Sequence, residues 1–357
     1  MEERIMKPQG LARLISHGQL LDQFVAPKLL GEVMAEGIYD ISVTLSSPIR
    51  DAFDYHFASL GKLVRADLAF QAARAKGLSL NAAYAWALGI ELIHNASLIH
   101  DDICDCDTTR RGQLTVHEKY GSETAICLGD TVLAQSFSVL AREPQLTRFI
   151  PVIASAVSQL SAGQAIEFSD DFEFGWANYE KLVEMKTAPL FKLPVLGLEC
   201  SSDKSISSTQ LLDRYFSLAA LAYQMKNDID DVEDGIKGSF VGHDFKDGRP
   251  NAVSVAFYES KNITRASHLN EVSHSANQHA VHGVSSAPDL KDKWHALLES
   301  DALIRTKNRV TKIVEEAQTL AGKLPIEERS LIAPIESCFQ TRSKSFHVNQ
   351  FHLGAKD

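Results

Sequence analysis

Two acidic clusters carry the residues whose types and spacing best suit chemistry. In each, two adjacent polar residues stand one helical turn before an aspartate: Asp101, Asp102 and Asp105 in the first, and Asn227, Asp228 and Asp231 in the second. A helix advances ~100° per residue, so positions i and i+4 share a face and i+1 flanks it. Grouped carboxylates repel by roughly 4 kcal/mol at about 4 Å, and Mg²⁺ relieves this by binding carboxylates together with phosphate oxygens. The clusters therefore predict a Mg²⁺-dependent diphosphate site.

The alternative is that these acidic runs are solvated helix faces, which is their usual role. An almost wholly apolar stretch, residues 85–100, leads into the first cluster, and another, residues 215–225, leads into the second. A helix that is apolar on all sides is buried. The carboxylates thus come where two buried helices end, and this neighbourhood favours a site over a surface.

The composition is that of an ordinary globular protein. The chain has 357 residues, of which 45% are hydrophobic and 23% charged, enough for one large or two ordinary domains. A net charge of −10 argues against nucleic acid as a partner, because nucleic-acid binding needs a basic face.

The sequence also predicts where the protein works. We expect no membrane span, because no stretch of about 18 apolar residues stands out. The start, Met1-Glu2-Glu3-Arg4, is acidic and does not resemble a signal peptide. Five cysteines without paired metal spacing indicate a reducing compartment. The expected location is the cytoplasm.

Helical periodicity prevails along the chain, and no segment alternates convincingly like a strand. It runs over residues 51–199 and 208–233 and returns at 291–323 and 327–342. Residues 258–290 are polar and contain four histidines, which we interpret as a mobile segment rather than a metal site. The predicted fold is all-α, a helical bundle around a central cavity.

Short motifs in a fixed order make a family recognisable. The longest is residues 91–120, ELIHNASLIHDDICDCDTTRRGQLTVHEKY; the others are Gly61–Arg65, Leu128-Gly129-Asp130, Gly163-Gln164, Met185–Ala188 and Gln224–Asp231. Over most of its length the chain resembles the trans-isoprenyl diphosphate synthases, or polyprenyl synthetases, and is similar to geranylgeranyl diphosphate synthases.

The resemblance implies a single isoprenoid synthase domain of the class I terpene synthase fold over residues 1–357, with peripheral helices over about 1–50. It implies a prenyltransferase that joins isopentenyl diphosphate to an allylic diphosphate. Two or three Mg²⁺ ions are expected with the substrate, and a homodimer is the expected assembly.

The resemblance also assigns residues to the allylic side of the reaction. The expected metal ligands are both acidic clusters, Asn227 included. The expected contacts to the allylic diphosphate are Arg110, Lys186 and Gln224, and Thr187 adds a hydroxyl near the reacting carbon. Catalytic roles fall to Asp101, Asp102, Asp105, Lys186, Thr187 and Asp228.

For the acceptor diphosphate the family positions are Lys62, Arg65, His94 and Arg111. Arginine suits phosphate because its planar fork pairs bidentately and stays charged. Taken alone, Lys62 and Arg65 are an ordinary surface pair at i, i+3, and His94 is a core histidine. The family match favours the binding roles.

Product length is predicted from the helix before the first cluster. Small residues, Ala96 and Ser97, stand one turn before Asp101, so the chain does not stop at C15. Tyr84 and Trp86 are candidate floors further back. The expected product is C20 geranylgeranyl diphosphate or longer.

Two departures bear on the reaction. Asn227 stands where the family usually has aspartate, which removes one negative charge but keeps a ligating oxygen. Ser239 stands where a lysine is usual, and Lys237 is the candidate substitute. Two alternatives therefore stay open: a class I terpene cyclase or a prenyltransferase with another acceptor, and a non-catalytic partner subunit of a synthase.

Overall fold

The computed structural model describes residues 27–198, 206–238, 240–259, 263–269 and 290–343. Its helices are α2 (Pro27–Ser42), α3 (Ile49–Phe57), α4 (Val64–Ala75), α5 (Leu80–Cys104), α6 (Val116–Tyr120), α7 (Ser122–Ala141), the 3₁₀ helix η2 (Thr147–Phe149), α8 (Ile150–Glu167), α9 (Trp176–Lys186), α10 (Ala188–Leu196), α11 (Ile206–Gly238), α12 (His243–Lys246), α13 (Ala252–Tyr258), α15 (Leu290–Glu299), α16 (Ala302–Ala321) and α17 (Ile326–Ser343). Two short antiparallel strands, β1 (Thr109–Arg110) and β2 (Gln113–Leu114), form a hairpin. The all-α prediction is confirmed.

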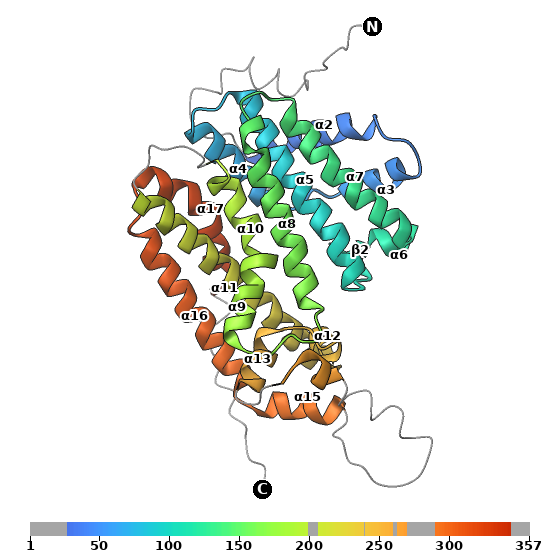
Figure 1. The fold of residues 1–357 in the computed structure, drawn as a ribbon, viewed down its shortest axis with the longest axis vertical. Coiled ribbons are helices and arrows are strands. Elements are labelled where there is room, and N and C mark those ends of the chain that lie inside the picture. Colours follow the sequence, from blue (N-terminus) through green and yellow to red (C-terminus); the bar gives the residue numbers. More distant parts are fainter. Residues whose placement is uncertain (1–26, 199–205, 239, 260–262, 270–289, 344–357) are drawn as a thin grey trace.

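The long helices lie side by side along the longest axis of the molecule, with α7 and α16 on opposite sides (Figure 1). The central helix α5 packs against α4 and α7, and α11 packs against α10 and α16. One hydrophobic core extends from Leu30 on α2 to Ile335 on α17. The short helices α12 and α13 lie at the end of the bundle to which α5 points its C-terminus (Figure 1).

Helix α5 is buried as its sequence predicts. Ser79 caps its start by accepting a hydrogen bond from the Ala82 main-chain nitrogen at 3.1 Å, which satisfies one of the open donors of the first turn. Its buried residues lie on every side, Trp86 and Ile90 among them. Such a helix stays in place because any tilt exposes apolar surface to water.

Two helices are apolar but little buried. Ser122–Ala141 and Thr147–Glu167 are long and apolar enough to cross a membrane by length and composition, yet only 33% and 22% of their most apolar windows are buried. Core helices of soluble proteins meet the same test, so this is weak evidence for a span. Of the large hydrophobic side chains on these two helices, only Ile126 is exposed.

The polar segment predicted over 258–290 falls largely outside the described residues. The described part behaves differently from a mobile loop, because the Phe174 nitrogen donates to Ile263 O and the Arg265 nitrogen donates to Phe172 O. His268 is buried and lies 2.9 Å from the Tyr258 hydroxyl. His274, His279 and His282 lie outside the described residues.

Candidate active site

The first cluster lies where α5 ends. Asp101 and Asp105 are one turn apart on one face, and the Asp105 nitrogen donates to Asp101 O at 2.7 Å as the last helical bond. Cys106 then takes a left-handed φ of 53° and turns the chain away. Burial raises the pKa of Asp101 to about 7, against the opposing effect of Lys186. The helix end therefore places two carboxylates where both interact with Lys186.

Asp102 faces a different partner from its neighbours. The β1–β2 hairpin, turned by Arg111 (φ 53°) and Gly112 (φ 79°), brings Arg110 back onto α5. The Arg110 guanidinium donates to the buried Asp102 carboxylate and also lies 3.3 Å from Asp107. We predicted that the three aspartates aim at one point; in the structure Asp102 is instead paired with the arginine expected to contact substrate.

A buried cation lies opposite Asp101. Lys186, the last residue of α9, forms an ion pair with the buried Glu167 at the end of α8. Burial lowers the pKa of Lys186, but Glu167, Asp105 and Asp101 outweigh it and raise the pKa above its usual value. Lys186 is therefore charged at any working pH.

Gly163 allows this approach of α8 to α9. A Cβ at Gly163 would lie 2.4 Å from the main-chain nitrogen of Lys186, a distance that no side chain tolerates. The Gly163-Gln164 motif thus has a physical reason, because only glycine lets the backbone carrying Lys186 come this close.

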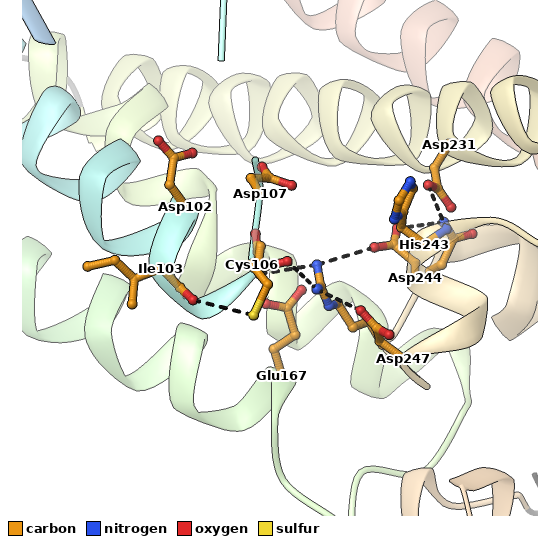
Figure 2. Close-up of polar contacts among 12 residues, drawn as sticks. Asp102, Ile103, Cys106, Asp107, Glu167, Asp231, His243, Asp244 and Asp247 are labelled. Carbon is orange, nitrogen blue, oxygen red and sulfur yellow. Dashed lines mark hydrogen bonds and ion pairs between the residues drawn. The ribbon is translucent and has the colours of Figure 1, made fainter. Parts of the chain in front are cut away.

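A loop residue, Arg249, links Asp105 of the first cluster to Asp244 and Asp247, and Asp244 in turn interacts with Asp231 of the second cluster. The Arg249 Nη2 donates to Asp105 O at 2.8 Å and to Asp247 at 3.0 Å, and its Nη1 lies 3.8 Å from Asp244. Figure 2 shows Asp231, Asp244 and Asp247 facing the end of α5 from the α11–α12 side. The Asp231 Oδ1 accepts the His243 main-chain N–H at 3.1 Å. Burial, and then Asp244, raise the pKa of Asp231 to about 6.

Asp228 is enclosed by hydrogen-bond donors. Its Oδ2 accepts from the Tyr179 hydroxyl at 2.6 Å and from the Ala252 nitrogen at 2.7 Å. Its Oδ1 accepts from Gln224 Nε2 at 3.0 Å, and Gln224 Oε1 in turn accepts from the Thr187 hydroxyl at 3.1 Å. The side chain is 2% exposed, so Asp228 lies behind the site rather than at its surface.

Asn227 and Lys237 of the predicted site are exposed on α11. Lys237 is 70% exposed and forms an ion pair with Asp234 at 3.2 Å. The structure does not bring the ammonium of Lys237 into the buried cluster of Asp101, Asp105 and Lys186, because it lies at the outer end of α11.

A second polar centre lies along α5, where Arg65 of α4 meets His94. The Arg65 Nη1 lies 3.4 Å from His94 Nε2. A guanidinium only donates, so His94 Nε2 accepts and the ring proton is assigned to Nδ1. Burial, and then Arg65, hold the pKa of His94 well below its usual value. The buried Nδ1 has no hydrogen-bond partner among the described residues, which leaves a donor ready for an oxygen that the protein does not supply.

Buried Glu91 supports the same centre. It lies one turn before Asn95, whose Nδ2 donates to Glu91 Oε1 at 3.0 Å, and its charge interacts with Arg65. Asn95 Oδ1 accepts from His56 Nε2 at 3.1 Å. Burial raises the pKa of Glu91, and Arg65 acts against that rise.

Arg111 and Lys62 complete this side. The Arg111 Nη1 donates to Ser59 O at 2.6 Å, and its guanidinium lies 3.0 Å from where a Cβ at Gly61 would stand. Gly61 has a φ of 67°, so both its backbone and its neighbour require glycine. Lys62 follows with an exposed side chain.

The predicted product-length residues take separate directions. Ser97 shares the face of Asp101, four residues away, whereas the buried Ala96 lies off that face. Trp86 is wholly buried and donates from Nε1 to Pro194 O on α10 at 3.0 Å. Tyr84 points to α2, where its hydroxyl lies 3.3 Å from Val33 O. Of the two candidate floors, Trp86 lies on the α10 side, the helix that follows Lys186.

The carboxylates fit a metal only in part. Among the described residues no three carboxylates, imidazoles or thiolates converge into a metal site. In the two acidic clusters, two buried carboxylate oxygens accept no hydrogen bond from the described residues: Asp105 Oδ1, although Arg249 Nη1 lies 3.3 Å away, and Asp231 Oδ2. These open carboxylate oxygens are too few to enclose an ion on their own. Such a partial set of ligands suits Mg²⁺, which completes its coordination shell with phosphate and water oxygens.

Sequence reasoning missed four residues of this site: Glu167, Tyr179, Asp244 and Arg249. Glu167 carried a readable signal, because it is the first charge after an uncharged apolar run, as Asp101 is on α5. Asp244, on the short helix α12, and Arg249, which directly follows Gly248, belong to a glycine-rich stretch after α11, where charged residues are common. Tyr179 gave no local signal.

Comparisons with known proteins identify the family and relatives of this chain. The family model described as Polyprenyl synthetase matches residues 46–287. A geranylgeranyl diphosphate synthase of Methanosarcina mazei is 29% identical over 229 residues, which are 61% of this chain and 70% of that protein. A geranylfarnesyl diphosphate synthase of Aeropyrum pernix is 29% identical over 250 residues, 67% of this chain and 75% of that protein.

Another relative is an octaprenyl diphosphate synthase of Haemophilus influenzae, 27% identical over 59% of this chain and 65% of that protein. Solved structures show the same fold. The geranylgeranyl pyrophosphate synthetase of Geoglobus acetivorans has a TM-score of 0.64 and 22% identity, covering 87% of this chain and 98% of that one. The heptaprenyl diphosphate synthase of Staphylococcus aureus has a TM-score of 0.70 and 20% identity, covering 90% and 98%.

Proposed function

Because the chain belongs to the polyprenyl synthetase family, we propose that it is a Mg²⁺-dependent trans-prenyltransferase. It condenses isopentenyl diphosphate with an allylic diphosphate of the C5 to C15 class and forms a longer trans-prenyl diphosphate. Relatives are named for products of different lengths, so the family leaves product length open.

One observation carries this proposal. Two buried carboxylate oxygens without hydrogen-bond donors, on Asp105 of α5 and Asp231 of α11, lie on the two sides of a site that also holds the buried cation Lys186. A buried polar atom without a partner costs free energy. Mg²⁺ bound together with a diphosphate would relieve that cost, with Asp105 and Asp231 as residues that would hold it.

The residues would divide the work as follows. Bound with the diphosphate, Mg²⁺ supplies charge neutralisation for the leaving group. Lys186 offers a fixed positive charge where negative charge develops as the allylic C–O bond breaks. The Thr187 hydroxyl donates to Gln224, which orients both groups beside the last turn of α9. Asp101 lies close enough to interact with Lys186.

The acceptor diphosphate would bind at the second polar centre. His94 presents its Nδ1–H, Arg65 and Arg111 add charge, and Lys62 stands exposed at the rim. Arg65 and Arg111 are held by protein groups before any ligand arrives, so less side-chain freedom is lost on binding. Two anion sites of this kind favour a second diphosphate as acceptor over a cyclase, which needs one.

We further propose a product of C20 or longer and a homodimer. Trp86 stands 15 residues before Asp101, which is ~22 Å along α5, and the small Ser97 leaves the first part of that path open. The homodimer follows from the resemblance to the family, and helices α7 and α8, of which only 33% and 22% of the most apolar windows are buried, leave surface for a second copy. Cytoplasmic location remains a prediction.

A product assay tests the proposal. Purified protein with Mg²⁺ receives isopentenyl diphosphate and a C5, C10 or C15 allylic primer in separate tubes, and mass spectrometry identifies the products. A discrete longer prenyl diphosphate supports the synthase. A hydrocarbon or alcohol from C15 or C20 diphosphate alone means a cyclase, and no product in any tube points to another acceptor or a partner subunit.

A further inference from the structure

The position of Asp228 differs from that of the other aspartates of the two clusters. Asp105 and Asp231 each keep a buried oxygen without a donor, whereas both oxygens of Asp228 accept hydrogen bonds from neutral groups. Asp228 is also 2% exposed. A carboxylate that already accepts three short hydrogen bonds must give some of them up before it binds a metal.

The donors to Asp228 come from three separate parts of the chain. Tyr179 belongs to α9, Gln224 is one turn earlier on α11, and Ala252 is the first residue of α13. Asn251 adds a bond from its Nδ2 to the main-chain oxygen of Asp228 at 3.1 Å. Asp228 therefore joins three helices at one point.

Helix α9 is hydrogen-bonded to α11 at two points along its length. Tyr179 contacts Asp228 directly, and Thr187, eight residues later, reaches it through Gln224. Two fixed points about two turns apart set both the rotation and the height of a helix. Lys186 lies on this segment, next to Thr187.

The opposite side of the site is held by the same residue. Asn251 Nδ2 also donates to Asp244 Oδ2 at 2.9 Å, and Asp244 lies beside Arg249, which bonds to Asp105. Asp228 is thus linked through short contacts to groups on both sides of the diphosphate site.

We propose that Asp228 is a positioning residue and not a metal ligand: it fixes Gln224, Thr187 and the end of α9, and so places Lys186 against the leaving diphosphate. This inference rests on the proposed function for its kinetic part. The metal ions would be held by the carboxylates with open oxygens, Asp105 and Asp231, together with Asp101.

Three variants separate the two roles. Asp228→Asn keeps the shape but removes acceptor capacity, Tyr179→Phe removes one donor and leaves the carboxylate, and Asp231→Asn is the matched metal-site control. For a positioning role we expect the first two to lower kcat by about tenfold with the Mg²⁺ concentration for half-maximal activity within about twofold of wild type. Asp231→Asn should raise that concentration by about tenfold.

Metal binding is also measured without turnover, by electron paramagnetic resonance of Mn²⁺ in the presence of pyrophosphate. Unchanged Mn²⁺ affinity in Asp228→Asn, with weakened affinity in Asp231→Asn, supports the positioning role even if no prenyl transfer is found. Equal losses in both variants would overturn it. If Asp228→Asn does not fold, Tyr179→Phe decides: lowered kcat with normal Mn²⁺ affinity supports the proposal, and wild-type kcat contradicts it.

Discussion

Arg249 holds Asp105 from across the site: its Nη2 donates to the Asp105 main-chain oxygen at 2.8 Å while its Nη1 lies 3.3 Å from the carboxylate. The two residues are 144 positions apart in sequence. Asp105 belongs to the end of α5 and Arg249 to the loop before α13, so this contact joins the two sides of the candidate site.

Removing this arginine should weaken both the fold and the diphosphate site. Arg249→Gln leaves Asp105, Asp244 and Asp247 without their shared cation, and breaking a buried ion pair in this way costs about 3 kcal/mol of unfolding free energy. Urea denaturation measures that loss, and initial rates should show a higher KM for the allylic diphosphate. The exposed Arg142→Gln is the control; equal stability in both variants contradicts the role of Arg249.

Gly163→Ala should disrupt catalysis more than folding. The added methyl lies 2.4 Å from the Lys186 nitrogen, so α8 and α9 must separate and carry Lys186 away from Asp101. We expect kcat to fall by at least about tenfold with a helical circular dichroism spectrum. Gly175→Ala is matched to it, because nothing lies within 4 Å of a Cβ there. Similar kcat values for Gly163→Ala and Gly175→Ala would show that a methyl group at residue 163 does not displace Lys186.

His94 should affect one substrate only. His94→Leu removes the buried donor and should raise the KM for isopentenyl diphosphate by about tenfold, with the KM for the allylic primer unchanged. His94→Gln keeps an N–H donor and should be milder. Because the pKa of His94 is held well below its usual value, the wild-type KM for the acceptor should show no step from His94 between about pH 6 and 8. A rise in both KM values would mean that His94 acts on the fold.

The stability of the protein should fall in acid through His56. Burial lowers its pKa to about 4, whereas the unfolded chain binds that proton near pH 6.5. The contribution of His56 is therefore full above pH 6.5 and is lost as the pH falls to about 4, by about 3 kcal/mol.

Denaturant titrations across this range, in wild type and in His56→Asn, isolate the effect as a difference between two curves. The exposed His295→Asn is the control and should follow the wild-type curve. Parallel curves for wild type and His56→Asn would show that His56 does not titrate in this way.

Product length should respond to Ser97 and Trp86. Ser97→Phe places a ring on the Asp101 face and should shorten the product, whereas Trp86→Ala opens the far end and should lengthen it. Ala96→Phe tests the other predicted product-length position, which is 3% exposed, and should also shorten the product if the chain passes on that side of α5. Mass spectrometry of the products gives the lengths. An unchanged distribution of product lengths in Ser97→Phe and Trp86→Ala would mean that the growing prenyl chain does not run along α5.

The sequence was enough to predict the all-α fold, because apolar periodicity and helix caps are local signals. It also located the end of α5, because a pair of carboxylates that follows a long apolar helix can be recognised from the local sequence alone. Helix α11 was likewise expected, although it extends to Gly238, beyond the predicted end near residue 233. The prediction of no strand missed the four-residue hairpin, which is too short for a periodic pattern.

What could not be predicted is how the side chains are shared among distant elements. Asp228 was read as one of several equivalent carboxylates, but Tyr179 stands 49 positions away and Ala252 24 positions away. Nothing in the spacing of α11 indicates those donors. The pairing of Asp102 with Arg110 gave no local signal either, because the hairpin that returns Arg110 depends on left-handed backbone at Arg111.

The most direct test of the central claim is pyrophosphate release from an allylic diphosphate, measured with and without isopentenyl diphosphate in the presence of Mg²⁺. A prenyltransferase with two diphosphate sites should release pyrophosphate only when the acceptor is present, one for each isopentenyl diphosphate consumed. Release from the allylic diphosphate alone, at the same rate with or without the acceptor, would contradict this account.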